Sequence, residues 1–192
     1  MSSRSSIVRT LSALLAGAAL TLTLAACGGG AESGGGAETA AGAGSGLVGK
    51  PAPDLTAEAV TGEGPKTIQE ASGKVTIVDF WATFCGPCKK SFPKYQALVD
   101  DSAGELTVIA VSVDEPDNAD KAKIEAFVKE TGVKFAVVWD KDQSIVKKYG
   151  VEKMPTSFIV DKTGVIRHVH AGYAEGEEEK IGEEVKALIA GQ

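Results

Sequence analysis

Val75-Thr-Ile-Val-Asp-Phe-Trp81, followed after Ala-Thr-Phe by Cys85-Gly-Pro-Cys88, is the stretch that decides the fold. Its first part is a run of β-branched and aromatic residues bounded by Gly73, a pattern typical of a strand buried on both faces. Beyond the cysteines, the segment 89–100 has apolar residues at helical spacing and contains Pro93, which predicts a kink. The sequence therefore predicts a CxxC pair between the end of a buried strand and the start of a helix.

This position gives the two cysteines different chemistry. Backbone N–H groups of the first helical turn and the helix dipole stabilise a thiolate, so we expect Cys85 to be the nucleophile. In such motifs the thiol pKa falls from about 8.5 to roughly 7 or lower. Cys88, one turn further in, is expected to be shielded and to act as the resolving thiol. Gly86 and Pro87 suit the helix start, where a proline surrenders no needed hydrogen bond.

Other functions of a cysteine pair fit this sequence less well. A structural zinc site needs four ligands, and the only other candidates are His168 and His170, whose spacing does not match a zinc finger. Both histidines alternate on a predicted strand and face one side, which we interpret as a solvated face. A copper-binding role for them with the cysteines is the alternative function, and a redox-inactive binding domain is a third. A peroxiredoxin-type peroxidase would need a proline and a threonine where Val78 and Ala82 stand.

The remaining patterns predict an α/β domain with a central mixed sheet and helices on both faces. Asp161-Lys-Thr-Gly164 is a strong hairpin signal, and the early glutamates of the last helix are expected to form a solvated helix start. Leu47 begins the domain, with an extended segment at Pro51 and Pro53. The expected strands are 106–113, 135–139, 156–160 and 165–169, and the expected helices are 117–130 (capped by Asp117 and ended by Gly132), 144–149 and 176–189.

The N-terminal part has the composition of a targeting segment. Residues 1–26 carry two arginines and then an apolar centre too short for a membrane span, which predicts a secretory signal peptide. The segment ends in Leu24-Ala-Ala-Cys27, which resembles a bacterial lipobox, so Cys27 is expected to carry a lipid; simple cleavage that leaves a free thiol is the alternative. Residues 27–46, rich in Gly, Ala and Ser, predict a flexible linker, which leaves 47–192 as the folded domain.

Composition limits the remaining possibilities. The chain has 192 residues, enough for one ordinary domain plus appendages. Its three cysteines cannot form a network of widely spaced disulfides. A formal charge of −6, without a run of Lys or Arg, argues against nucleic-acid binding.

Two motifs together resemble a known superfamily. The stretch Asp79-Phe-Trp-Ala-Thr-Phe-Cys-Gly-Pro-Cys-Lys89 and the later Met154-Pro155-Thr156 resemble the thioredoxin superfamily. The Phe-Trp-Ala-Thr segment, an insertion around 116–139, the lipobox and the linker are similar to its TlpA/ResA group of exported thiol–disulfide oxidoreductases. The resemblance covers residues 47–192 and implies a thioredoxin fold with a redox disulfide Cys85–Cys88. It also implies a cis peptide bond at Pro155 opposite the cysteines, with the Met154 backbone pairing with the substrate; an ordinary loop proline is the alternative.

Three further residues belong to the predicted site. Asp79 is a carboxylate in an otherwise apolar strand, so burial should raise its pKa and let it exchange protons with Cys88. A position at the strand end, in contact with water, is the alternative. Trp81 and Phe84 flank the cysteines and are placed with the substrate-binding residues: Phe84 as part of an apolar lip, Trp81 mainly as a core residue.

The resemblance also implies a direction and partners. The Gly86-Pro87 dipeptide is that of reducing thioredoxins, so the expected activity is reduction of disulfides in exported proteins, such as cytochrome c precursors or metal-site proteins. A membrane thiol carrier would supply the electrons, and neither cofactor nor metal is expected. The domain would be anchored through Cys27 and would face the periplasm or the cell exterior.

Overall fold

A six-stranded mixed sheet forms the centre of the computed structural model, which describes residues 44–191. The predicted signal peptide, Cys27 and most of the predicted linker lie outside the described residues. The sheet has the order β1-β4-β3-β2-β5-β6. Its strands are β1 (Glu58–Thr61), β2 (Val75–Trp81), β3 (Leu106–Ser112), β4 (Ala136–Trp139), β5 (Thr156–Val160) and β6 (Ile166–Ala171). The helices are a 3-10 turn at Ser45–Leu47, α1 (Gly86–Asp101), α2 (Lys121–Thr131), α3 (Ser144–Tyr149) and α4 (Glu177–Ile189).

Strand β2 lies inside the sheet, parallel to β3 and antiparallel to β5. Every residue of β2 and of β3 is buried, which confirms the prediction of a strand covered on both faces. Both strands point their carboxyl ends to the same edge of the sheet, and the chain leaves β2 there to enter α1. The cysteines therefore lie at this edge.

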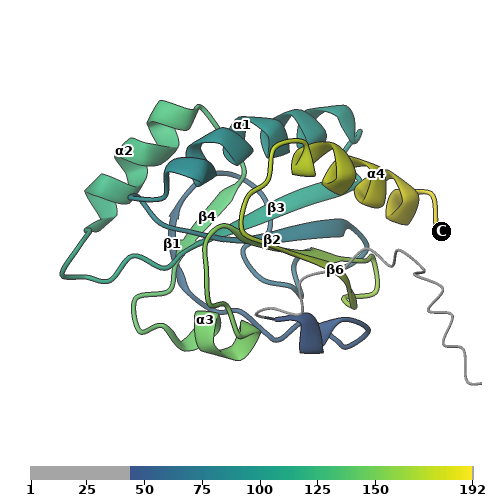
Figure 1. Ribbon diagram of the computed structural model, residues 1–192, viewed down its shortest axis with the longest axis horizontal. Helices are drawn as coiled ribbons and strands as arrows, with labels where there is room; N and C mark the ends of the chain where they lie inside the picture. The colour runs from purple at the N-terminus through teal and green to yellow at the C-terminus, as the bar shows by residue number, and fades with distance from the viewer. Residues whose placement is uncertain (1–43, 192) are drawn as a thin grey trace, which may run out of the picture. The chain divides into compact units, whose positions relative to one another are not determined.

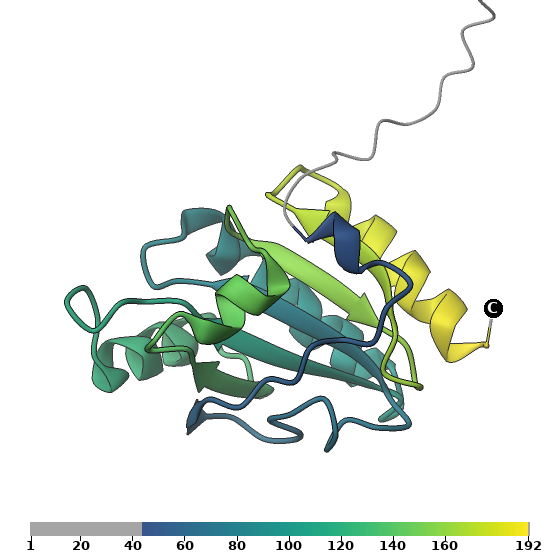
Figure 2. The same ribbon diagram turned by 90° about the horizontal axis from the view of Figure 1, so that it is seen from below.

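Helices cover both faces of the sheet, as predicted. Figure 1 shows α1, α2 and α4 on one side and α3 on the other. The face under α1 is filled by an aromatic cluster in which Phe92 contacts Trp81, Phe127 and Phe135 with ring centroids 4.9, 5.7 and 5.4 Å away. Figure 2 shows the other side, where α3 and the segment leading to β1 cross the sheet. The helix that begins at the CxxC motif therefore packs on a well-filled core.

One strand was not expected from the sequence, and the expected strand 135–139 is present as β4 (Ala136–Trp139). The chain before Val75 contains β1, a short edge strand that pairs antiparallel with β4 and was not predicted beyond an extended start. The expected insertion 116–139 contains α2 and β4, and β4 joins the sheet between β1 and β3. The insertion is therefore an integral part of the sheet.

The helix boundaries also need correction. Helix α1 begins at Gly86 and continues past Pro93. Asp120, not Asp117, is the N-cap of α2, because its carboxylate accepts the Lys123 backbone N–H at 2.8 Å. Gly132 ends α2 with a φ of 72°, as predicted.

The interpretation of the β6 histidines as a solvated face is wrong for His170. Only 6% of its side chain is exposed, and its ring nitrogens lie 2.6 Å from Glu184 Oε2 and 3.2 Å from Glu177 Oε1 of α4. His168 points to the same helix, with Nδ1 3.5 Å from Glu184. Glu177 at the start of α4 and Glu184 in its middle therefore hold the helix against β6. No helix within residues 44–191 is long and apolar enough to cross a membrane.

Candidate active site

The two cysteines form a disulfide at the start of α1. Cys85 is the N-cap residue of the helix, and its Sγ accepts the backbone N–H of Cys88 at 3.2 Å. The two residues differ in access, since Cys85 is 7% exposed and Cys88 is fully buried. Pro87 occupies the first helical turn, as expected. A substrate sulfur approaching from solvent therefore reaches Cys85 before Cys88.

The loop that delivers Cys85 to this position is tied down by a residue that the sequence did not single out. Asp114 is fully buried, and its carboxylate accepts hydrogen bonds from the Thr83 backbone N–H (2.9 Å) and the Thr83 hydroxyl (2.7 Å). The Ser112 hydroxyl donates to the same carboxylate at 2.9 Å. Asp114 thus links the end of β3 to the chain two residues before Cys85. An aspartate just after a buried strand was the only signal for it.

The surface around Cys85 is apolar. Phe84 is 66% exposed, and Gly86 and Pro87 are exposed beside it. The peptide bond Met154–Pro155 is cis, and Met154 packs against the hydrophobic cluster that contains both cysteines. Phe80 pairs with Thr156 in the sheet, which places Pro155 at the same end of β2 as Cys85.

Trp81 does not belong to this surface. Its side chain is fully buried and packs on Phe92 and Phe127 with ring centroids 4.9 and 4.6 Å away. A direct contact with substrate, one of its two predicted roles, is therefore wrong for Trp81. Its core role accounts for its position.

Asp79 lies in the middle of β2, two residues from both Ile77 and Trp81, so the three side chains share one face of the strand. Ile77 and Trp81 belong to the same cluster as Cys88, so Asp79 faces the α1 side of the sheet. It is fully buried, so the alternative of a strand end in water is wrong. Desolvation raises its pKa from 3.8 to about 7, against the opposing effect of a hydrogen bond from Ser157. A group with this pKa exchanges protons near neutral pH.

Two hydroxyl groups near Asp79 were also missed. Ser157 Oγ lies 2.6 Å from Asp79 Oδ1, and the Tyr95 hydroxyl lies 2.8 Å from Ser157 Oγ. Only weak signals in the sequence point to them: Ser157 is a polar residue within an apolar strand, and Tyr95 has the spacing of a core residue of α1.

The histidines do not join the cysteines in a metal site. Among residues 44–191, no group of three or more His, Cys, Asp or Glu side chains is arranged to hold a metal ion. His170 has both ring nitrogens engaged by Glu177 and Glu184. The copper-binding alternative therefore gains no support.

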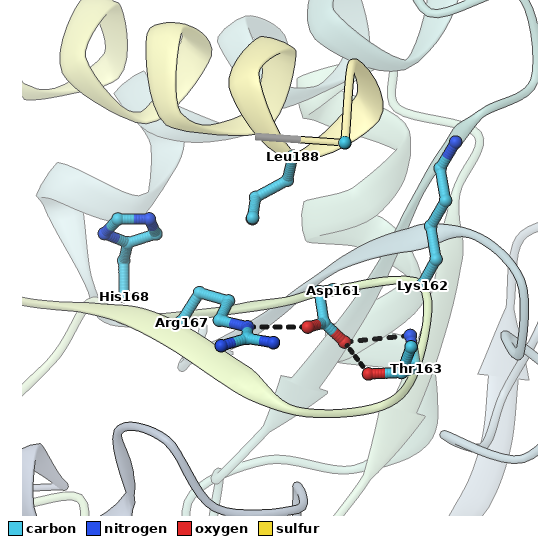
Figure 3. Close-up of a pocket in the computed structure, with 7 residues that line it drawn as sticks. Asp161, Lys162, Thr163, Arg167, His168 and Leu188 are labelled. Carbon is cyan, nitrogen blue, oxygen red and sulfur yellow. Dashed lines mark hydrogen bonds and ion pairs between the residues drawn. The ribbon is translucent and has the colours of Figure 1, made fainter.

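A pocket of about 490 Å³ lies under the C-terminal end of α4, beside the β5–β6 hairpin, and contains neither cysteine. Figure 3 shows Arg167 directed at Asp161, which also accepts from the Thr163 backbone and hydroxyl. Burial opposes ionisation of Asp161, but these hydrogen bonds outweigh it and lower its pKa to about 2. The polar groups of this pocket thus stabilise the hairpin turn.

Comparison with known proteins agrees with the geometry. The AhpC/TSA family matches residues 48–169, which include the cysteine pair and the cis proline. The chain belongs to the AhpC/TSA family. It is 34% identical to the thioredoxin-like protein YneN of Bacillus subtilis, over 65% of this chain and 71% of YneN. It is 33% identical to the thiol–disulfide oxidoreductase ResA of Bacillus thuringiensis, over 75% of each chain.

A solved structure supports the same conclusion for this AhpC/TSA member. The thiol:disulfide interchange protein DsbE from Chlorobium tepidum is 31% identical, with a TM-score of 0.63, and the match covers 74% of this chain and 97% of DsbE. The fold is therefore the thioredoxin fold, and the activity is thiol–disulfide exchange of the ResA/DsbE type.

The burial of Asp79 predicts a pH-dependent stability. The unfolded carboxyl loses its proton near pH 3.8 and the folded one near about 7, so between these values the folded state binds more protons and stability falls as pH rises. Asp79→Asn removes this effect. Its stability relative to the wild type should increase by up to about 4 kcal/mol between pH 4 and pH 8.

Denaturant unfolding of the oxidised proteins measures this difference, because a disulfide removes the titration of both thiols. Other groups titrate alike in the two proteins and cancel. A stability difference that stays constant from pH 4 to pH 8 would show that Asp79 titrates normally.

Proposed function

We propose that the protein is an exported, lipid-anchored reductase that breaks disulfides in other exported proteins by using Cys85 and Cys88. The observation that carries this proposal is the unequal exposure of two cysteines at the start of α1, beside an exposed apolar surface. A slightly accessible sulfur followed by a fully buried one suits a reaction that forms and then resolves a mixed disulfide.

In the first step, the reduced Cys85 attacks one sulfur of a client disulfide as a thiolate. A bond forms between Cys85 Sγ and that sulfur, and the other client sulfur leaves as a thiolate. The N-terminal end of α1 stabilises the attacking charge, because its backbone N–H groups and dipole point toward Cys85. Phe84 and the Met154–Pro155 segment are the groups positioned to bind the client chain.

In the second step, Cys88 attacks Cys85 Sγ, and the client leaves with two thiols. Two electrons have then passed from the cysteine pair to the client, and the Cys85–Cys88 disulfide is formed. Cys88 must lose its proton in a dry site. Asp79 accepts this proton, since it lies on the same side of the sheet and has a pKa of about 7.

The direction of transfer follows from the Gly86-Pro87 dipeptide, which resembles that of reducing thioredoxins. Each cycle leaves the protein oxidised, so it needs an electron donor; a membrane thiol carrier meets that need. The clients we infer are exported proteins whose cysteines must be reduced before they bind haem or a metal, such as cytochrome c precursors. Residues 1–26 direct export, and Cys27 and the linker 27–46 hold the domain near the membrane surface.

Replacing Cys88 with serine should trap the client. The Cys88→Ser variant can form the mixed disulfide through Cys85 but lacks the thiol that resolves it, so client adducts should accumulate and disappear on treatment with dithiothreitol. Non-reducing gel electrophoresis and mass spectrometry of cell envelopes identify them.

Cys85→Ser is the matched control and should trap nothing. Adducts that form equally well through Cys88 in this variant would contradict the assignment of the nucleophile. In parallel, the reduced wild type should reduce the disulfides of insulin, whereas a protein that only oxidises dithiols would contradict the direction.

A lipid anchor at Cys27 predicts that the protein incorporates a labelled fatty acid. Cells grown with a palmitate analogue should label the wild type, and Cys27→Ala should remove the label and release the protein from the membrane fraction. The Cys85→Ser protein should stay labelled. A Cys27→Ala protein that remains both labelled and membrane-bound would contradict the anchor.

A further inference from the structure

The proposed proton acceptor is held by a buried chain of hydroxyl groups. Tyr95 of α1, Ser157 of β5 and Asp79 of β2 come from three elements and are each at most 2% exposed. The Tyr95 hydroxyl lies 2.8 Å from Ser157 Oγ, which lies 2.6 Å from Asp79 Oδ1. The carboxylate therefore has a defined partner on one of its two oxygens.

The direction of these hydrogen bonds follows from counting protons. Ser157 has a single hydroxyl proton and donates it to Asp79 Oδ1. Tyr95 must then be the donor to Ser157. Burial, followed by the charge of Asp79, raises the pKa of Tyr95 well above its ordinary value, so it keeps its proton. Both hydroxyl dipoles point toward the carboxylate, and each strengthens the other.

The second oxygen of Asp79 is different. Oδ2 is buried and has no hydrogen-bond partner among the residues that the structure describes. An unpartnered buried carboxylate oxygen is costly, and such atoms are candidates for a chemical role. With Oδ1 occupied by Ser157, Oδ2 is the oxygen left to receive a proton.

We propose that Tyr95 and Ser157 are positioning residues that orient Asp79, reserve its Oδ2 for proton exchange with Cys88, and set the pH at which that exchange occurs. This inference rests on the proposed acid–base role of Asp79. It assigns a function to two hydroxyl groups that have no contact with substrate.

The groups around Asp79 determine whether loss of the Ser157 hydrogen bond raises or lowers its pKa. On α1 the titratable groups on this side are Tyr95 and the cysteines; β6 contributes His170, which pairs with Ser157 in the sheet. Helix α4 contributes Glu177 and Glu178, whose charges act on Tyr95, and Glu184, which contacts His170. For Asp79 itself, desolvation raises the pKa and the Ser157 hydrogen bond is the counteracting contribution. Removing that bond leaves desolvation uncompensated.

The test measures how fast Cys88 resolves a mixed disulfide formed between Cys85 and a small aromatic thiol, from pH 5.5 to pH 9.5. Resolution requires Asp79 as a carboxylate, so its rate rises with pH through the pKa of Asp79. Ser157→Ala should move the midpoint of this rise upward by about one pH unit, and Tyr95→Phe by about half as much. At neutral pH both variants should therefore resolve more slowly.

Three matched variants distinguish a positioning role from a nonspecific loss of structure or activity. Ser157→Thr keeps the hydroxyl and should retain the wild-type midpoint. Tyr149 belongs to the cluster on the opposite face of the sheet, and its hydroxyl donates to the backbone carbonyl of Pro53. Tyr149→Phe removes this hydroxyl and should leave the midpoint unchanged. In an Asp79→Asn background, Ser157→Ala should cause no further shift.

The outcomes distinguish this inference from the proposed function. If Asp79→Asn abolishes the pH-dependent rise but Ser157→Ala and Tyr95→Phe leave the wild-type midpoint in place, the positioning role is overturned and the acid–base role survives. The positioning role also fails if Ser157→Ala slows resolution at neutral pH as much in the Asp79→Asn background as in the wild type. If Asp79→Asn itself keeps the wild-type profile, the acid–base role is overturned, and the positioning role with it.

Discussion

The placement of Cys85 at the N-cap of α1 is the constraint on which the rest of the site depends. At this point the sulfur accepts the backbone N–H of Cys88 and lies at the positive end of the helix dipole. The position is fixed from both sides. Strand β2 is buried along its whole length, and Asp114 holds the loop before the cysteine by accepting hydrogen bonds from the backbone N–H and the hydroxyl of Thr83. The reactive sulfur is thus presented by a rigid junction between a strand and a helix.

This rigidity coexists with a cost to stability at Asp79. A carboxylate buried inside an apolar strand disfavours the folded state whenever it is charged, and an apolar residue would fit the strand better. The same burial gives the group a pKa near neutral, which a proton acceptor for a buried thiol requires. The Ser157 hydrogen bond limits the cost. Perturbed ionisable groups of this kind tend to lie at functional sites, and here the group faces the same side as Cys88.

The sequence predicted the features that are encoded locally. Apolar runs predicted the buried strands, and the helical spacing of apolar residues after the cysteines predicted α1, although not its first residue. The cis bond at Pro155 followed from resemblance to a family motif. Gly132 ended its helix as expected, because an αL residue is needed there and glycine adopts it readily.

Other features depend on contacts between distant parts of the chain, so local patterns did not reveal them. Ser157 is 78 residues from Asp79 and 62 from Tyr95 in the sequence, so no local pattern joins them. His170 looked exposed because its glutamate partners lie on a helix that folds back over β6. Strand β1 was missed because it is short and forms only against β4, which lies far along the chain.

The central claim is that the start of α1 makes Cys85 the reactive thiol. Alkylation of the fully reduced protein by iodoacetamide from pH 5 to pH 9, with each cysteine followed by mass spectrometry, tests it most directly. The account predicts that Cys85 reacts first, with a midpoint below the ordinary thiol value of about 8.5, while Cys88 stays protected. Equal reaction of both cysteines with a midpoint near that value, or faster reaction of Cys88, would contradict it.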